Sequence, residues 1–408
     1  MSAEASKILS AAENIITSGK NAIGIGDNST IYFVISLLII AFIIFLLVTW
    51  VFYTLNKKGA ACKKLNNIYL ESNKFQTKHS IFTQHGNVTS LAEPNNYFND
   101  EHKSLVKNYY IKTAYNSCCG DGYKNNFVNI CALEKCIKQG ARCLDFEIYS
   151  YNGEPIVAAS TANNNSIKET YNYIKIPELF NIIKAQSFHI ALSCQYDPMF
   201  LNFRIMSENK IIYDKMGEYI KEYLNDDILD TTKYNYLHNN NDNDKFITEH
   251  IGKKHFGSKF IIMVHTLHNN ILDTSDLAKY VNLSTGYNSV FRIIRYKDLV
   301  AAGSNNPMLV DESHRSLLMV LPDINNSIEN YDPILAINNG CQFIGMKFQN
   351  IDSNLISFFN LFTEFGSGYS FVLKPSHLRM DNIPAVIPTS GATMSPTDPT
   401  DMTIGTTS

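Results

Sequence analysis

The chain has 408 residues, a formal net charge of −3 and 18% charged residues. A nearly neutral chain of this kind lacks the basic footprint of a nucleic-acid-binding protein. Its 45% hydrophobic content excludes a wholly disordered chain, and its length allows one large domain with accessory segments.

The N-terminal part contains a long apolar run. Residues 1–30 predict a short amphipathic segment. Residues 31–55, IYFVISLLIIAFIIFLLVTWVFYTL, carry no charge and can cross the roughly 30 Å hydrocarbon layer as one helix. Trp50 and Tyr53 near the end of this run suit the aromatic belt of a membrane interface. We therefore expect a single-pass membrane anchor.

The basic residues around the apolar run predict its orientation. Lys57, Lys58, Lys63 and Lys64 follow the run, whereas Lys20 is the only base close before it. The positive-inside rule then places the C-terminal domain in the cytoplasm.

The cysteines and one sequon bear on the same question. The eight cysteines form neither the CxxC pairs of a zinc site nor a dense disulfide ladder, so we expect reduced, mostly buried thiols. The sequon Asn87-Val88-Thr89 would be glycosylated only if the topology were reversed.

Strand-type and helix-type patterns alternate after a polar lead-in or stalk, residues 56–104. The strand-type runs cover residues 109–115, 143–149, 156–159, 188–193, 200–205, 259–265, 342–348 and 369–373, and helical patterns cover residues 128–139, 176–184 and 209–224. Such alternation predicts an α/β fold with a mostly parallel sheet, and the number of units favours a closed barrel. Residues 226–250 read as an Asn/Asp-rich insertion, and residues 380–408 as a disordered tail.

The stretch RCLDFEIYSYNGEPIV contains two acids at alternate positions. Asp145 and Glu147 point to the same side of a strand. A buried pair of carboxylates is costly unless a cation, a proton or solvent meets it. The sequence therefore predicts a polar site at this strand.

Three stretches carry a family likeness. Residues 109–123 (YYIKTAYNSCCGDGY), 133–157 (LEKCIKQGARCLDFEIYSYNGEPIV) and 338–379 (NNGCQFIGMKFQN and GSGYSFVLKPSHLR) resemble the X and Y halves of phosphoinositide-specific phospholipase C. The resemblance implies a distorted (β/α)8 barrel, with residues 105–225 as the X-like half and residues 251–379 as the remainder with the Y-like half. The plan with an anchor also resembles phospholipase-like membrane proteins of some large DNA viruses. That resemblance implies a virion membrane or an internal membrane of a host cell as the location.

The site residues of the family are mostly replaced in this chain. The first catalytic histidine falls at Tyr115, before Asn116, and the second falls at Ala159. The calcium-binding Glu-x-Asp pair is swapped as Asp145-x-Glu147. The last acidic ligand falls at Arg204. Two further lysines expected by the resemblance fall near Met263 and His265.

These replacements suggest an inactive barrel. Phosphodiester cleavage by the family's route needs a base, an acid and a cation on the phosphate oxygens. We hypothesise that Arg204 takes the place of the metal by binding Asp145 and Glu147, so that no cofactor is needed. In the alternative, the two acids and Asn116 still hold Ca²⁺ and Arg204 points to solvent.

The function predicted on this basis is a membrane-anchored phospholipase C-like barrel without catalysis. It would bind a membrane lipid, for example a phosphoinositide headgroup, or a protein partner, with His265 and Lys374 as candidate phosphate contacts. The rival is an active phosphoric diester hydrolase with a rearranged site that uses Tyr115, Asp145 and Glu147 and recruits His265 as its base.

Weaker patterns are more simply structural. His265 and His268 are three residues apart on a strand and would face opposite sides, which disfavours a metal pair. Cys118 and Cys119 lack a nearby base. The basic clusters His314-Arg315 and Lys253-Lys254-His255 are typical of solvated surface, with contact to anionic lipid headgroups as the alternative.

Overall fold

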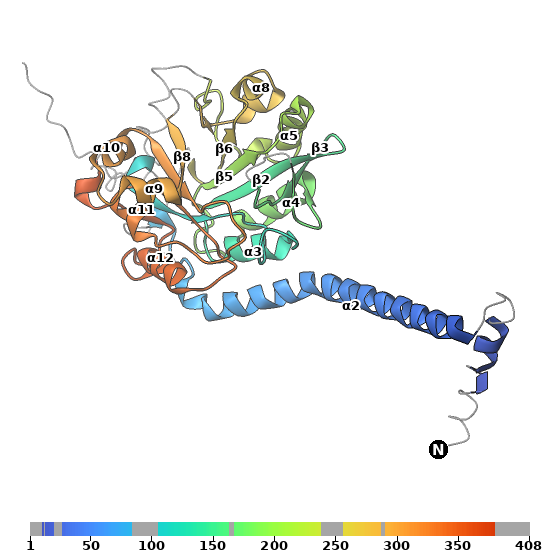
Figure 1. Ribbon diagram of the computed structural model, residues 1–408. Helices are drawn as coiled ribbons and strands as arrows, with labels where there is room; N and C mark the ends of the chain where they lie inside the picture. Colours follow the sequence, from blue (N-terminus) through green and yellow to red (C-terminus); the bar gives the residue numbers. More distant parts are fainter. Residues whose placement is uncertain are drawn as a thin grey trace, which may run out of the picture. The chain divides into compact units, whose positions relative to one another are not determined.

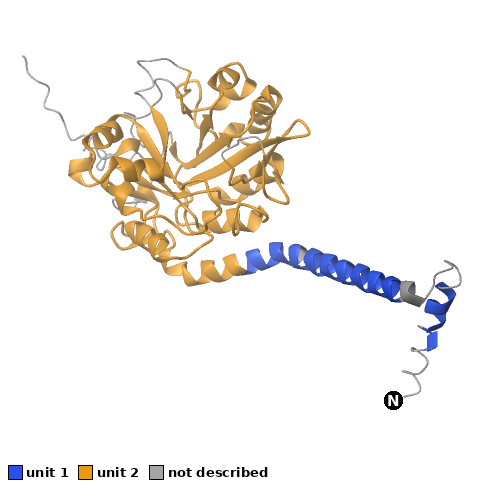
Figure 2. Cartoon of the chain, in the orientation of Figure 1, with its two compact units in different colours: residues 1–63 blue, residues 64–408 orange. Residues whose placement is uncertain are grey.

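The structure is a computed structural model that describes residues 10–11, 13–19, 27–83, 105–162, 167–237, 256–286 and 290–379. It divides into two compact units, residues 1–63 and 64–408 (Figure 2). The long helix α2, Asp27–Glu71, begins in the first unit and ends in the second. Its apolar part has a mean hydropathy of 3.3 over its most apolar window and is not buried, so one described helix is long and apolar enough to span a membrane.

The second unit contains all the strands. They are β1 (Tyr109–Ala114), β2 (Cys143–Tyr151), β3 (Glu154–Ala158), β4 (Ile174–Lys175), β5 (Met199–Ile205), β6 (Phe260–Thr266), β7 (Leu283–Ser284), β8 (Phe291–Arg295), β9 (Leu317–Leu321), β10 (Phe343–Met346) and β11 (Phe371–Leu373). The α-helices are α3 (Ile130–Lys138), α4 (Ile176–Ser187), α5 (Lys210–Tyr223), α8 (Asn269–Asp273), α9 (Tyr296–Ala302), α10 (Pro307–Arg315), α11 (Ile334–Asn338) and α12 (Ser353–Thr363). The short 3-10 helices are η1 (Asn73–Phe75), η2 (Ile81–Thr83), η3 (Val106–Asn108), η4 (Asn225–Asp227), η5 (Asp276–Tyr280) and η6 (Ser376–Leu378).

Eight parallel strands form a nearly closed barrel in the order β7-β6-β5-β2-β1-β10-β9-β8. In the part of the chain that the structure describes, β7 and β8 at the two ends of this series do not pair. Strand β3 pairs antiparallel with β2, and β11 pairs antiparallel with β1. The barrel fold expected from the sequence is therefore confirmed.

Burial on both faces explains the near-continuous apolar strands. All seven residues of β5 are buried, as are six of the seven in β6. Helices α3, α4 and α5 lie outside β2 and β5 (Figure 1). On that outer side, Phe203 packs against Phe146 at a ring distance of 5.7 Å and against Phe180 of α4 at 5.9 Å. Strands covered by helices in this way carry little polar alternation.

Side-chain caps fix where several helices begin. Asn129, Asn209, Asn306 and Asp352 each accept hydrogen bonds from backbone N–H groups in the first turn of the helix that follows. An N-cap of this kind typically contributes about 1 kcal/mol. Asn129, Asn209 and Asp352 follow the carboxyl-terminal ends of β1, β5 and β10, so these three caps fix where the loops after those strands end.

The segment after α2 packs on the barrel. Phe75, Ile81 and Phe82 belong to its hydrophobic core. The buried Lys112 ammonium donates to the carbonyl oxygens of Phe75 and Gln139, at 2.9 and 2.7 Å. A polar lead-in was predicted over residues 56–104. Its described residues from 64 to 83 belong to the second unit, because these apolar side chains pack against the barrel.

Two other expectations need correction. Residues 188–193 form no strand: α4 ends at Ser187, and successive turns follow, with N–H to carbonyl bonds from Leu192 to His189 and from Gln195 to Leu192. The first part of the predicted insertion 226–250 packs on the domain, because Leu229 and Tyr234 are buried in the core. Residues 238–250 and the tail 380–408 lie outside the described residues.

The cysteines are of two kinds. Cys118, Cys119, Cys136, Cys143, Cys194 and Cys341 are free and buried, as expected. Cys62 and Cys131 are disulfide-bonded, so the expectation of reduced thiols is wrong for these two.

Candidate functional site

The register of two neighbouring strands brings the predicted acids and the arginine together. Asp145 and Glu147 of β2 lie opposite Asn202 and Arg204 of β5 in the parallel ladder. Since alternate residues share a face, all four side chains point to the barrel interior. Asp145 and Arg204 are fully buried and Glu147 is 3% exposed.

The guanidinium group of Arg204 contacts both carboxylates. Its Nε donates to Asp145 Oδ1 at 2.8 Å and its Nη2 to Asp145 Oδ2 at 2.8 Å. Its Nη1 donates to Glu147 Oε1 at 3.0 Å, and Nη2 also reaches Asn116 Oδ1 at 2.8 Å. The bond to Asp145 is bidentate, the geometry that favours arginine over lysine. The two acids raise the pKa of Arg204 well above its usual value, although burial alone acts in the opposite direction.

Other donors occupy the remaining sites on the carboxylate oxygens. Asp145 accepts from Asn202 Nδ2 at 2.7 Å and from the Asn116 backbone N–H at 3.1 Å. Glu147 accepts from Asn116 Nδ2 at 3.0 Å, from the Tyr149 hydroxyl at 2.8 Å and from the Ser160 N–H at 3.1 Å. Each of the four oxygens therefore receives two hydrogen bonds.

A calcium ion does not fit this arrangement. Ca²⁺ requires about 6–8 oxygen ligands, with free carboxylate lone pairs among them. Here Arg204 fills the space between the acids, and the Asn116 amide oxygen is turned toward Arg204. In the described residues no cluster of three or more His, Cys, Asp or Glu side chains could hold a metal ion.

Two tyrosines cover this network. The ring of Tyr115, at the first family-histidine position, lies 5.0 Å from the Arg204 guanidinium carbon and packs edge-on against Tyr123 at 5.8 Å. Both rings are almost fully buried. Burial raises the pKa of the Tyr115 hydroxyl to about 12, so Tyr115 stays protonated near neutrality.

Three loops close the mouth of the barrel, at the carboxyl-terminal ends of its strands. We call them the mouth loops: residues 115–129, residues 159–162 with 167–173, and residues 322–333. Asn326 Oδ1 accepts from the N–H groups of Tyr123 and Lys124 at 3.1 and 3.0 Å. Lys124 forms an ion pair with Glu169 at 2.9 Å. The loops therefore hold one another over Tyr115 and Tyr123.

The other family positions offer little acid–base chemistry. Ala159 is fully buried beside Glu169, whose N–H donates to its carbonyl oxygen. Met263 is buried on β6. His265 is partly exposed at the mouth, and its Nδ1 lies 2.7 Å from Thr285 Oγ1. Burial, together with the charges of Arg204 and Arg295, lowers the pKa of His265 to about 4.

The weaker sequence patterns separate in space or are buried. His268 lies 3.5 Å from Glu208, while His265 faces Thr285, so the two histidines share no ligand. Burial raises the pKa of the Cys118 and Cys119 thiols well above the usual value, which suppresses nucleophilic thiolate. Residues 253–255 lie outside the described residues.

Lys374 lies at the opposite end of the barrel from His265. It follows β11, and Leu373 pairs with Tyr109, the first residue of β1. Its backbone N–H donates to the Asn108 carbonyl oxygen at 2.9 Å. The two candidate phosphate contacts named from the sequence therefore do not form one site.

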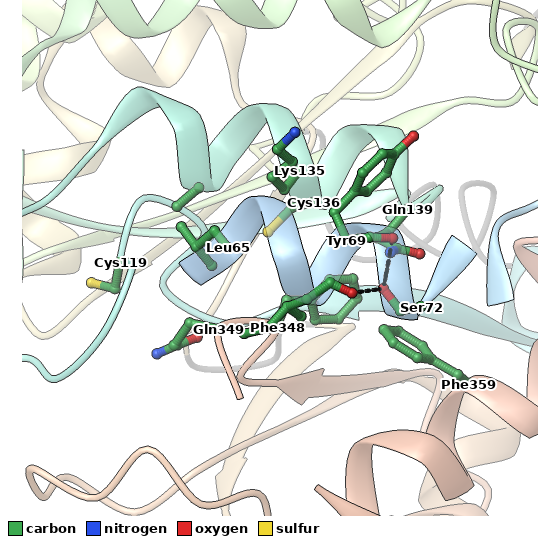
Figure 3. Close-up of a pocket in the computed structure, with 12 residues that line it drawn as sticks. Leu65, Tyr69, Ser72, Cys119, Lys135, Cys136, Gln139, Phe348, Gln349 and Phe359 are labelled. Carbon is green, nitrogen blue, oxygen red and sulfur yellow. Dashed lines mark hydrogen bonds between the residues drawn. The ribbon is translucent and has the colours of Figure 1, made fainter. Parts of the chain in front are cut away.

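Neither of two described hollows contains the carboxylates or Arg204. One is a small cavity of about 20 Å³ beneath the end of α2, where Gln139 hydrogen-bonds to Ser72 (Figure 3). The other, of about 760 Å³, is lined mainly by polar residues between Thr231 and Lys279, together with the apolar Leu237 and Ala278. The Arg204 network lies outside both.

Sequence reasoning missed several partners of the network. Tyr149 lies two residues after Glu147 on the same strand face, a spacing that could have revealed it. Asn202 lies two residues before Arg204 for the same reason. The backbone donor of Ser160 and the Asn326 contact to Tyr123 arise from loop conformation, for which the sequence carries no periodic signal.

Comparisons with known proteins agree with this architecture. PLC21 from L. pealei superposes with a TM-score of 0.54 at 15% identity, covering 68% of this chain and 38% of that one. PLC21 from S. officinalis gives 0.53 at 16% identity, covering 69% and 38%. The chain thus spans well under half the length of these phospholipases.

No protein-family model and no curated protein sequence matches the chain. The solved structures and the parallel barrel together define a divergent phospholipase C-like fold. At these identities the likeness concerns the fold.

Proposed function

We propose that this chain is a membrane-anchored phospholipase C-like barrel that does not cleave phosphodiesters and serves as an interaction module at a membrane. The observation that carries the proposal is the Arg204 guanidinium, which binds both Asp145 and Glu147 inside the barrel. A permanent cation there leaves the acids satisfied without a metal ion.

The chemistry of the site supports inactivity. A general base should have a pKa near the operating pH and reach the proton that it abstracts. Tyr115 stays protonated near neutrality, and Ala159 has no functional group. His265 is neutral there but a weak base, because its pKa is lowered to about 4. Acid–base groups typically contribute ~10²–10⁴-fold each, so the barrel lacks much of the rate enhancement.

The closed mouth favours an interaction role over holding a lipid headgroup within the barrel. A headgroup would have to displace Tyr115 and Tyr123, which are 4% and 2% exposed. Displacement would also break the contacts of Asn326 and the Lys124–Glu169 ion pair. The surface of the mouth loops, rather than the interior, is then the part that meets a lipid or a protein partner.

The anchor is the apolar part of α2. The charge distribution around it supports a cytoplasmic barrel, because four lysines follow the apolar run. The disulfide-bonded state of Cys62 and Cys131 supports the other side of the membrane, because disulfides are rare in reducing compartments. We propose the cytoplasmic orientation.

The proposed inactivity is tested with the full-length chain incorporated in vesicles that contain labelled phosphatidylinositol. The measurement is release of water-soluble inositol phosphate, with Ca²⁺ and with a chelator, beside a bacterial phosphatidylinositol phospholipase C as a positive control. We expect no release above vesicles alone in either condition. Release that disappears in an Asp145→Asn variant would establish the rival hydrolase.

A further inference from the structure

Basic side chains from three segments converge at the amino-terminal end of the barrel, opposite its mouth. Lys374 follows β11, Lys107 lies in η3, and His314 lies in the last turn of α10. Burial lowers the pKa of His314, and the nearby positive charges of Lys374 and Lys107 lower it further. We call these three residues the amino-end cluster.

Two polar atoms of the cluster are buried without a hydrogen-bond partner. They are Lys374 Nζ and His314 Nε2. Lys374 is only 2% exposed. The buried Lys112, by contrast, donates to two carbonyl oxygens, and so does Lys347, at 2.8 and 3.0 Å. A buried ammonium without an acceptor is costly, so Lys374 is unusual among these lysines.

The acids near the cluster are engaged elsewhere. Asp311, which acts on His314, pairs with Arg315, and Glu312 pairs with Arg292 at 3.1 Å. Gly340 lies beside the Lys374 amine in a tightly packed place, since a side chain there would begin 3.7 Å from Lys374 Nζ and 2.6 Å from Ser313 Oγ. Among the described residues, Lys374 Nζ and His314 Nε2 thus have no carboxylate acceptor.

We propose that the amino-end cluster binds a small tetrahedral oxyanion of the phosphate type, held by Lys374 Nζ and His314 Nε2 in the field of Lys107. Such an anion supplies the acceptors that both unpaired atoms lack, and charge-assisted bonds of this kind are about twice as strong as neutral ones. The site does not depend on the state of the mouth, so it stands apart from the proposed function.

Without a bound anion, burial lowers the pKa of the Lys374 amine to about 7. The Lys107 charge also lowers this pKa, and Cys341 raises it. Phosphate binding favours the ammonium form. We therefore expect proton uptake on binding near pH 7.5, seen as a dependence of the titration heat on the ionisation enthalpy of the buffer.

The test is thermal unfolding of the full chain in a non-ionic detergent, with inorganic phosphate varied at constant ionic strength. The rise in unfolding temperature should follow the logarithm of the phosphate concentration above Kd and reach about 5 °C at about 100 times Kd. Glycerol phosphate serves as a second arm: equal stabilisation would assign the site to a phosphomonoester headgroup as well as to free phosphate.

Two variants make the test specific. Lys374→Met should unfold at the wild-type temperature or above without phosphate, because an unpaired buried amine is removed, and should not respond to phosphate. Lys112→Met is the matched control: it should be less stable yet keep the phosphate response. His314→Phe, as an independent variant, should weaken phosphate binding about tenfold or more.

An unfolding temperature of the wild-type chain that does not change with phosphate concentration would overturn the proposal. An equal phosphate response in wild type and Lys374→Met would do the same, because stabilisation would then arise elsewhere. If Lys374→Met does not fold, the comparison of wild type with His314→Phe decides by the same criterion.

Discussion

Buried charged side chains are stable only when each has a partner of opposite charge and its hydrogen bonds are made. Asp145, Glu147 and Arg204 are all within a few per cent of full burial, and each carboxylate oxygen has two donors. Removing one partner of such a set leaves an uncompensated charge, which costs more than the intact set gains. At this scale one side chain, Arg204, decides whether a metal ion has a role.

Replacing Arg204 should therefore destabilise the protein strongly. We expect Arg204→Met to lose about 3–5 kcal/mol of unfolding free energy near pH 7. The loss should shrink as the pH falls, because unpaired buried carboxylates take up protons. Denaturant unfolding at several pH values measures this. The control is Arg292→Met, whose pair with Glu312 is half exposed on the arginine side and should contribute under about 1 kcal/mol.

If Arg204→Met lowered the unfolding free energy no more than Arg292→Met does, the account of a buried network would be contradicted.

The buried Lys112 gives a pH-dependent prediction. Burial lowers its pKa to about 7 in the folded protein, whereas an unfolded lysine titrates at about 10.4. Between these values the unfolded state binds the extra proton, so the contribution of Lys112 to stability rises with pH.

The difference in unfolding free energy between wild type and Lys112→Met should thus grow from pH 7 to pH 9, by about 2–3 kcal/mol at most. Parallel denaturant titrations at the two pH values test it. A constant or shrinking difference would show that the folded amine keeps its proton.

At the scale of elements, the mouth loops differ from the barrel beneath them. The barrel is held by continuous ladders of paired strands, whereas the loops are held by separate contacts. Among these contacts are the Asn326 hydrogen bonds, the Lys124–Glu169 ion pair and the bond from the Asn125 N–H to the Glu169 carbonyl oxygen. Separate local contacts allow local opening without unfolding of the barrel, so closure of the mouth depends on particular contacts.

Asn326→Ala should loosen the loop of residues 115–129 selectively. The amides of Tyr123 and Lys124 lose their acceptor, so their hydrogen exchange should accelerate, with a stability loss of about 1 kcal/mol. Asn325→Ala is the matched control, because within the described part of the chain Asn325 accepts a hydrogen bond from the exposed Ser327 N–H and from no other group. Equal exchange in both variants would mean that another contact closes the mouth.

At the scale of the whole molecule, the sequence predicted the barrel but not that the mouth loops would cover its mouth. Alternating acids on an apolar strand indicated the site, and the resemblance indicated Arg204 at a ligand position. The contact from Asn326 to Tyr123 joins residues 203 apart, which no local pattern encodes. The prediction of a strand at residues 188–193 was wrong, because a short apolar run occurs both in strands and in turns that follow a helix.

The orientation in the membrane is also a property of the whole chain. A cytoplasmic barrel predicts that Asn87 stays unglycosylated when the chain is made in cells with a secretory pathway. A glycosidase-sensitive mass shift that is lost in an Asn87→Gln variant would show that the barrel lies on the other side of the membrane. It would then agree with the disulfide-bonded Cys62 and Cys131.

The most direct measurement of the central claim is a calorimetric titration of the full chain in detergent with Ca²⁺. Because Arg204 occupies the position between Asp145 and Glu147, we predict no saturable heat up to millimolar Ca²⁺ and no change in unfolding temperature with a chelator. Binding of one ion per chain that is lost in Asp145→Asn would contradict the account.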